Sequence, residues 1–371
     1  MAVSKGVFRF GLVIRPHLQW ADGSHYNRHP KAESMISQSS ETDDRNGITL
    51  VTGGSGFLGR HLVAALLARG TRVRVLDPTI AGLPPEVQAV RGTVTDPASV
   101  ARALDGVDVV HHLAGLPDLW LPDGSRFDQV NRVGTEIVLE QAARRGMTRV
   151  VHCSTEGVLI PWPRRRGGTI DERADARFED MAGPYCRSKF LAEKAALDAA
   201  RGGLPVVVVN PTALIGPGDR NGTPPSGMIR MLAAGAMPFH LACRLNLVDA
   251  RDVALGHILA AEKGSVGERY ILGGENIAMA DLIRAVASLT GHPGRSLAIP
   301  RWLALATGHA SEWLADHVTR KAPQAPLTGV RLALAGGDFD SGKARRELGF
   351  NPRPLAETLT DTLKDMALST A

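Results

Sequence analysis

A glycine-rich segment near residue 50 constrains the fold of this chain more than any other feature. Residues 52–59 read T-G-G-S-G-F-L-G and directly follow an apolar run at residues 48–51. An apolar-periodic stretch, residues 58–67, comes next, so the pattern predicts a strand, a tight turn and a helix. At such a turn the N–H groups that begin the helix can face a phosphate.

The glycines of this segment have separate predicted roles in a dinucleotide site. We expect Gly53 to permit the tight turn and Gly56 to let the backbone approach a pyrophosphate. Gly59 would let the helix pack close to the sheet. The predicted cofactor-binding residues of the segment are Gly53, Ser55, Gly56, Phe57 and Leu58.

A second strand indicates which dinucleotide binds. Residues 71–77 read T-R-V-R-V-L-D and end in Asp77, about twenty residues past the glycines. A carboxylate there accepts hydrogen bonds from a free ribose 2′-OH and repels a 2′-phosphate. We therefore predict NAD as the cofactor, with NADP as the less favoured alternative because Arg72 and Arg74 lie in the same strand.

Composition excludes several classes of function. The chain has 371 residues, 44% hydrophobic, enough for a large α/β domain and a smaller one. The net charge of +5 is spread along the chain except at residues 164–166, interpreted as a solvated loop, so we expect no nucleic-acid partner. Cys153, Cys186 and Cys243 have no paired or metal-ligand spacing. This predicts a reducing, cytoplasmic location and no metal.

Two segments bear on order and on membranes. Residues 1–46 lack periodicity and are predicted to be a disordered extension, with Met35 as an alternative start. No apolar run is long enough to span a bilayer. Residues 299–318 are apolar with polar interruptions, and we favour packing within the protein over contact with a membrane surface. A homodimer is left open.

Strand and helix patterns alternate from residue 48 to about residue 211. Strands are expected at residues 108–113, 149–154 and 205–209, and helices at 131–143 and 184–200. This alternation predicts a Rossmann-type, doubly wound parallel sheet. The predicted division is an NAD-binding domain at 47–215, with 244–262 returning to it. A smaller, mostly helical substrate-binding cap is expected at 216–243 and 263–371.

A tyrosine and a lysine supply candidate catalytic groups. In Y-C-R-S-K, Tyr185 and Lys189 lie four residues apart, on one face of the predicted helix. A nearby ammonium group favours the phenolate, so the tyrosine can exchange the proton that balances a hydride transfer. Ser154 and Thr155 end the preceding strand, and one of these hydroxyls is expected to hold the substrate oxygen.

Over roughly residues 47–365 the chain resembles an extended short-chain dehydrogenase/reductase of the NAD-dependent epimerase/dehydratase superfamily. Besides the segments above, the matching features are H-L-A-G at 112–115, V-N-R-V-G-T at 130–135, C-S-T-E-G-V at 153–158, N-P-T-A-L-I-G-P-G-D at 210–219, L-N-L-V-D-A-R-D-V-A at 245–254 and R-R-E-L-G-F-N-P-R-P at 345–354. The resemblance implies that the catalytic hydroxyl is Thr155. It adds the cofactor-binding residues Asp96, Leu113, Ala114, Gly115, Asn131, Pro211 and Thr212.

Within that family the motifs resemble 3β-hydroxysteroid dehydrogenases, including sterol-4-carboxylate decarboxylating enzymes, and dihydroflavonol-reductase-like, hopanoid-associated proteins. We therefore predict an NAD-dependent oxidoreductase for a bulky apolar alcohol or ketone, such as a sterol or terpenoid. Apolar segments at 116–121 and 159–162, with Met228, Met231, Met237 and Phe239, would border the substrate.

Two other functions stay open at this point. The first is a nucleotide-sugar epimerase or dehydratase, for which Arg230, Arg244 and Asn246 could bind a diphosphate. Glu156 resembles an acid of the dehydratases, but Gly157 stands where they carry a second one. The other is a cofactor-sensing regulator without catalysis, against which the intact Thr155, Tyr185 and Lys189 argue.

Overall fold

The computed structural model describes residues 47–163, 168–220, 222–292 and 294–368. The predicted disordered extension at 1–46 and the predicted loop at 164–166 lie outside the described residues.

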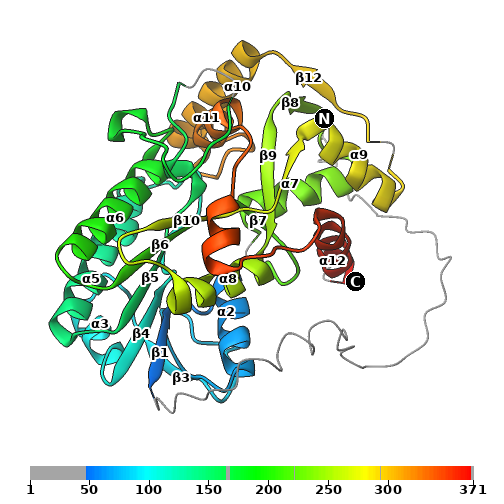
Figure 1. Cartoon of the computed structure of the whole chain (residues 1–371). Helices are drawn as coiled ribbons and strands as arrows, with labels where there is room; N and C mark the ends of the chain where they lie inside the picture. The colour runs from blue at the N-terminus through cyan, green and yellow to red at the C-terminus, as the bar shows by residue number, and fades with distance from the viewer. Residues whose placement is uncertain (1–46, 164–167, 221, 293, 369–371) are drawn as a thin grey trace, which may run out of the picture. The chain divides into compact units, whose positions relative to one another are not determined.

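A seven-stranded sheet forms the centre of the fold, with the strand order β10-β6-β5-β4-β1-β2-β3 (Figure 1). All neighbouring strands in it are parallel. The strands are β1 (Ile48–Thr52), β2 (Arg72–Asp77), β3 (Gln88–Arg91), β4 (Val107–His112), β5 (Arg149–Cys153), β6 (Val206–Pro211) and β10 (Arg269–Leu272). The predicted Rossmann-type fold is therefore confirmed.

Helices cover both faces of this sheet, because successive strand side chains point to opposite sides. Val150, Val206 and Val208 pack in a core with α3, α5 and α6. Val151 and Val207 belong to a core that also contains residues of α8. The helices are α2 (Phe57–Ala68), α3 (Pro97–Ala103), α4 (Ser125–Phe127), α5 (Gly134–Arg145), α6 (Pro184–Arg201), α7 (Pro224–Ala233), α8 (Ala250–Lys263), α9 (Met279–Thr290), α10 (Arg301–Leu314), α11 (Leu327–Ala335) and α12 (Leu355–Leu368).

The predicted division into domain and cap needs two corrections. Residues 263–371 were assigned to the cap, but β10 pairs with β6 in the main sheet. Residues 244–262 are predicted to return to the main domain, but only α8 packs against the main sheet. Residues 244–249 form β9, which belongs to a separate sheet with β7 and β11. The strands outside the main sheet are β7 (Ala213–Ile215), β8 (Phe239–Leu241), β9 (Arg244–Asp249), β11 (Glu275–Ala278) and β12 (Leu297–Ile299).

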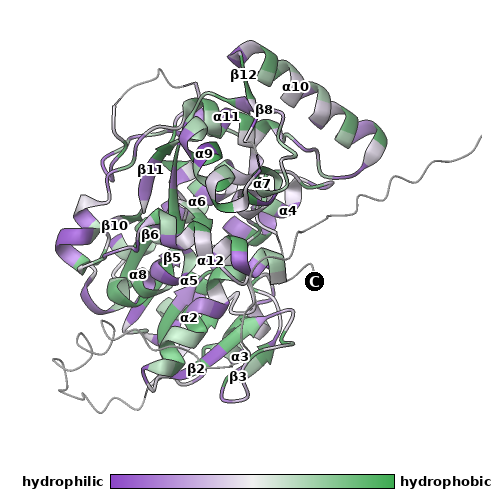
Figure 2. Ribbon diagram, turned by 90° about the vertical axis from the view of Figure 1, so that its right-hand side faces the viewer, coloured by the Kyte–Doolittle hydropathy of each residue, from purple (hydrophilic) through white to green (hydrophobic). Residues whose placement is uncertain are grey.

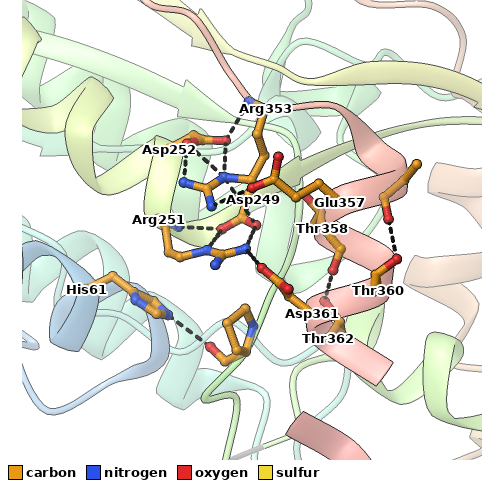
Figure 3. Close-up of polar contacts among 12 residues, drawn as sticks. His61, Asp249, Arg251, Asp252, Arg353, Glu357, Thr358, Thr360, Asp361 and Thr362 are labelled. Carbon is orange, nitrogen blue, oxygen red and sulfur yellow. Dashed lines mark hydrogen bonds and ion pairs between the residues drawn. The ribbon is translucent and has the colours of Figure 1, made fainter. Parts of the chain in front are cut away.

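An ion-pair network joins the C-terminal segment to the start of α8 (Figure 3). The Arg353 guanidinium contacts Asp252 at 2.9 Å, and its backbone N–H donates to the same carboxylate at 2.8 Å. Arg251 pairs with Asp249 at 2.7 Å and with Asp361 of α12 at 2.8 Å. The motifs at 245–254 and 345–354 therefore meet in space, and their charged residues fix the end of the chain.

The amphipathic segment at residues 299–318 packs on one face only. Ala304, Gly308 and Ala315 are buried. Trp302 and Trp313, on the opposite side, are 69% and 60% exposed. Figure 2 shows apolar residues along α10, at the top of the view, and α10 packs against α11. Among the described helices, none is both long enough and apolar enough to cross a bilayer.

A group of buried histidines lies at the carboxyl ends of β4 and β5 and in α8. The ring nitrogens of His112 contact the hydroxyls of Thr52 and Thr135 at 2.7 and 2.9 Å. His111, His152 and His257 are also buried. Within the described residues, both ring nitrogens of His152 and of His257 lack a hydrogen-bond partner. Burial lowers the pKa of His111 to about 4.

Candidate active site

The glycine turn between β1 and α2 has the geometry that its sequence predicts. Gly53 has a φ of 72°, and a Cβ there would lie 2.8 Å from the backbone nitrogen of Ala114. A Cβ on Gly59 would collide with the carbonyl oxygen of Gly53. A Cβ on Gly56 would meet only that carbonyl, at 3.2 Å. Gly53 and Gly59 are therefore needed for the turn itself, whereas Gly56 leaves space for a ligand.

Asp77 closes the other side of this turn. Its carboxylate accepts hydrogen bonds from the backbone N–H of Ser55 at 3.2 Å and of Thr79 at 2.9 Å. The side chain is 9% exposed and lines the cavity described next. A buried carboxylate at this position opposes a second negative group such as a 2′-phosphate.

A continuous cavity of about 790 Å³ joins the glycine turn to the catalytic groups. It extends along the carboxyl ends of the strands, where ligands bind in open α/β sheets. The predicted site residues that line it are Gly53, Ser55, Gly56, Phe57, Leu58, Asp77, Leu113, Ala114, Gly115, Ser154, Thr155, Tyr185, Lys189, Pro211 and Thr212. We call the part lined by residues 53–60, 76–79 and 92–94 the cofactor half.

Asp96 and Asn131 lie outside the lining of this cavity. Asp96 caps α3, where its carboxylate accepts from the N–H groups of Ala98 and Ser99 at 3.1 Å. Gly92, Thr93 and Val94, which the sequence analysis did not single out, line the cavity just before Asp96. A cofactor contact by Asp96 remains a prediction.

Asn131 does not line the cavity, but it forms hydrogen bonds with residues next to it. It lies in a π-helical turn, η1 (Asp128–Val133), and is buried. Its side-chain oxygen accepts from the N–H of Leu116 at 2.7 Å, and its amide donates to the Ser188 hydroxyl at 3.0 Å. Asn131 therefore ties the segment that begins at Leu116 to α6, the helix that carries Tyr185 and Lys189.

The predicted catalytic groups meet at the end of β5. The Tyr185 phenol is hydrogen-bonded to the Thr155 side chain. Burial raises the pKa of Tyr185, and the Thr155 hydrogen bond opposes this rise. Lys189 donates to the carbonyl of Cys153 at 2.6 Å, and burial lowers the pKa of its ammonium group. Tyr185, Thr155 and Lys189 therefore lie at one edge of the sheet, and Ser154, the other hydroxyl predicted from the sequence, lines the same cavity.

A buried hydroxyl tests whether a dinucleotide fits the site. Ser154 lines the cavity, and its Oγ has no hydrogen-bond partner among the described residues. Such a group is satisfied by a ligand or by water. Together with the opening at Gly56 and the carboxylate of Asp77, it fits a dinucleotide lying between the glycine turn and Thr155. Within the described residues no cluster of side chains could hold a metal ion.

Glu156 is a further ionisable group of this site. It lines the cavity and accepts a hydrogen bond from the Thr155 hydroxyl at 3.0 Å. Burial raises the pKa of Glu156 to about 7. From its sequence, Glu156 resembles only a dehydratase acid, and its place directly after Thr155 is the signal that could have identified it.

The chain is similar in sequence to a family of NAD-dependent enzymes and to several of its members. The sequence model described as "NAD dependent epimerase/dehydratase family" matches residues 49–273. Sterol demethylase protein B of Methylococcus capsulatus is 33% identical, over 85% of this chain and 97% of its own. A 3 beta-hydroxysteroid dehydrogenase/Delta 5-->4-isomerase of Mycobacterium tuberculosis is 31% identical, over 82% and 86% of the two chains.

A solved structure shows the same fold with a cofactor. The dTDP-glucose 4,6-dehydratase DesIV of Streptomyces venezuelae, crystallised with NAD bound, is 25% identical and has a TM-score of 0.70. The match covers 86% of this chain and 97% of that one. The chain therefore belongs to the NAD dependent epimerase/dehydratase family, as an extended short-chain dehydrogenase/reductase that uses NAD.

Proposed function

We propose that this enzyme interconverts a secondary alcohol and a ketone on a bulky apolar substrate of the 3β-hydroxy sterol or terpenoid class. The observation that carries the proposal is the apolar lining of the cavity beside Tyr185. We call this part the substrate half; its apolar residues are Leu116, Leu119, Met228, Leu332, Ala333 and Phe339. Apolar walls with few polar groups suit a rigid hydrocarbon ligand.

Two of the three polar residues that could bind a diphosphate, Arg244 and Asn246, form ion pairs or hydrogen bonds with other residues of the protein. Arg244 forms an ion pair with Asp338 at 2.5 Å. Asn246 accepts from the Thr212 hydroxyl at 2.7 Å and donates to Asn276 at 2.8 Å. Arg230 does not line the cavity. These contacts leave Arg244 and Asn246 less free to bind a charged substrate.

The proposed chemistry assigns one task to each catalytic side chain. In the oxidising direction the Tyr185 phenolate removes the carbinol proton, while Thr155 donates a hydrogen bond to the same oxygen. Lys189 would hold the nicotinamide ribose and favour the phenolate. When bound, NAD⁺ would supply the hydride acceptor and a positive charge that favours the phenolate. The residues predicted to hold it are Gly53, Ser55, Gly56 and Asp77.

The names of two relatives agree with this substrate class. One is a 3 beta-hydroxysteroid dehydrogenase, and a mouse protein that is 29% identical is named sterol-4-alpha-carboxylate 3-dehydrogenase, decarboxylating. If the substrate carries a carboxylate β to the new ketone, the β-keto acid can lose CO₂ without another catalytic residue. Decarboxylation therefore belongs to the proposal as an accompanying step.

A nucleotide-sugar epimerase or dehydratase is the second candidate. The observation that favours it is Arg126, a cation that lines the cavity next to the substrate half. A guanidinium can bind a diphosphate through paired hydrogen bonds. The two candidates differ in their use of NAD, since a dehydrogenase releases NADH whereas an epimerase returns the hydride.

The deciding experiment measures NADH formation with a substrate panel. We expect NADH to accumulate with at least one 3-hydroxy sterol or triterpenoid alcohol when NAD⁺ is supplied. UDP- and dTDP-sugars form the second half of the panel, analysed for isomerised or dehydrated product. Turnover of a nucleotide sugar without NADH accumulation, and silence with every sterol and triterpenoid, would reject the proposed function.

A further inference from the structure

The Glu156 carboxyl occupies a position that the chemistry proposed above does not use. It follows Thr155 directly, in the 3₁₀ turn η2 (Glu156–Val158), and faces the cavity. Its side chain meets the Thr155 hydroxyl at 3.0 Å. The carboxyl therefore competes with any substrate oxygen for the same hydroxyl proton.

The hydrogen-bond inventory of Thr155 makes this competition explicit. A threonine hydroxyl has one proton to donate and two lone pairs to accept with. One lone pair accepts from the Gly157 N–H at 3.2 Å, and the other is open to the hydroxyl of the neighbouring Tyr185. The single proton is donated to Glu156. As long as Glu156 is a carboxylate, Thr155 has no proton left for a substrate oxygen.

A protonated Glu156 reverses this arrangement. The carboxylic acid then donates its own proton to the Thr155 oxygen, so the hydroxyl proton of Thr155 can turn toward the cavity. When the Tyr185 hydroxyl turns to the substrate oxygen as well, that oxygen receives two donors, one for each lone pair.

We propose that Glu156 is a positioning residue that works as a neutral carboxylic acid and directs the Thr155 hydroxyl proton onto the substrate oxygen. The inference rests on the proposed function, in which Thr155 holds that oxygen. No covalent step involves Glu156, and it carries no hydride or proton to the product.

The surroundings of Glu156 favour its neutral form. The ionisable groups that face it from α6 are the Tyr185 phenol and the Cys186 thiol, and a negative charge on either opposes a negative charge on Glu156. On β5, the Cys153 carbonyl holds the ammonium group of Lys189 at 2.6 Å. The α11 residues that line the cavity, Gly329, Leu332 and Ala333, cannot ionise. Burial is the largest cause of the raised pKa of Glu156, at about 7.

The first test compares the pH dependence of ketone reduction in the wild type and in Glu156→Gln. The probe is 5α-cholestan-3-one with NADH. Above pH 7, kcat/KM of the wild type should fall roughly tenfold per pH unit as Glu156 ionises. The amide that Glu156→Gln introduces can donate to Thr155 without ionising, so this fall should be absent from the variant.

A matched control and a second variant separate positioning from structure. Glu172 also has a pKa raised by burial, but it accepts from the backbone N–H of Ile271 and does not line the cavity. Glu172→Gln should keep the wild-type pH profile. Glu156→Ala should also lose the fall above pH 7, because nothing then holds the Thr155 proton. If both Glu156 variants keep the wild-type profile and only lose rate, the proposal is wrong.

A second measurement does not need turnover. The infrared carbonyl stretch of a protonated carboxyl is recorded against pH in the NAD⁺ complex. The wild type should show a band that disappears around pH 7 and is missing from Glu156→Gln. A Glu156 that is ionised throughout this range would overturn the inference. If the band titrates as expected while no sterol or triterpenoid is turned over, the proposed function fails and the protonation of Glu156 stands.

Discussion

The two halves of the cavity are built in different ways. The cofactor half contains several glycines, and one continuous segment, residues 53–60, supplies much of its lining. The substrate half consists of side chains from segments far apart in the chain, around Leu119, Met228 and Leu332. The first is fixed by conformation, as the φ of 72° at Gly53 illustrates. The second is fixed by packing, so it can change residue by residue.

This difference teaches where the chain tolerates substitution. A side chain on Gly59 would collide with backbone, which cannot move aside without breaking the turn. A substitution in the substrate half would change the shape of the cavity and leave the sheet intact. Substrate choice can therefore diverge within one fold while cofactor binding stays the same.

The largest effect is expected at the junction of the two halves. Tyr185→Phe removes the proton carrier, so turnover should fall by roughly a hundredfold or more. Binding of NADH, followed by fluorescence titration, should stay nearly unchanged. Tyr270→Phe is the matched control, because the Tyr270 hydroxyl contacts Glu347 at 2.8 Å and does not line the cavity. A Tyr185→Phe enzyme that works near the wild-type rate would contradict the proposed chemistry.

A smaller effect is expected within the cofactor half. Asp77→Asn removes the negative charge, and the preference for NADH over NADPH should drop roughly tenfold, about 1.4 kcal/mol. Dissociation constants of both cofactors give the measurement. Asp96→Asn serves as comparison, since capping α3 needs only an acceptor oxygen. If Asp77→Asn keeps the wild-type preference for NADH over NADPH, another residue selects the cofactor. If Asp96→Asn changes the dissociation constant of either cofactor, that change would support the predicted contact of Asp96 with the cofactor.

The smallest effect is expected within the substrate half. Ala333→Val adds two methyl groups to its wall, and KM for a bulky sterol should rise by about threefold or more. The dissociation constant of NADH should not change. Ala310→Val, on the exposed side of α10, should alter neither quantity. If Ala333→Val weakened NADH binding as much as sterol binding, the two halves would not be separate.

The sequence predicted the cofactor half better than the rest because that half is local. The turn at residues 52–59 and the carboxylate at Asp77 are contiguous signals with a known geometry. The short strand β10 was missed because four residues after a glycine turn carry little periodicity, and only its pairing with β6 identifies it. Asp96 directly precedes Pro97, a pair typical of a helix start, so the sequence did hold a signal that this carboxylate caps α3.

The substrate half was predicted only in part. The apolar segment around Leu119 was identified, but the contributions of Leu332, Ala333 and Phe339 depend on how α11 and the segment that follows it pack in the fold. Met231 and Phe239, two of the predicted substrate residues, do not line the cavity and are 37% and 57% exposed. Helical and strand periodicity show which face of an element is apolar, whereas the tertiary fold decides which cavity that face lines.

The buried histidines at the ends of β4 and β5 give the protein a lower pH limit. Burial lowers the pKa of His111 to about 4 and of His112 to about 3, whereas an unfolded chain takes up these protons near pH 6.5. The contribution of each such imidazole to the free energy of unfolding is fully present above pH 6.5. Below pH 6.5 this contribution decreases by up to about 1.4 kcal/mol per pH unit, until the pH reaches the pKa of the imidazole in the folded protein. This acid sensitivity originates in the interior, so replacing charges on the surface would not remove it.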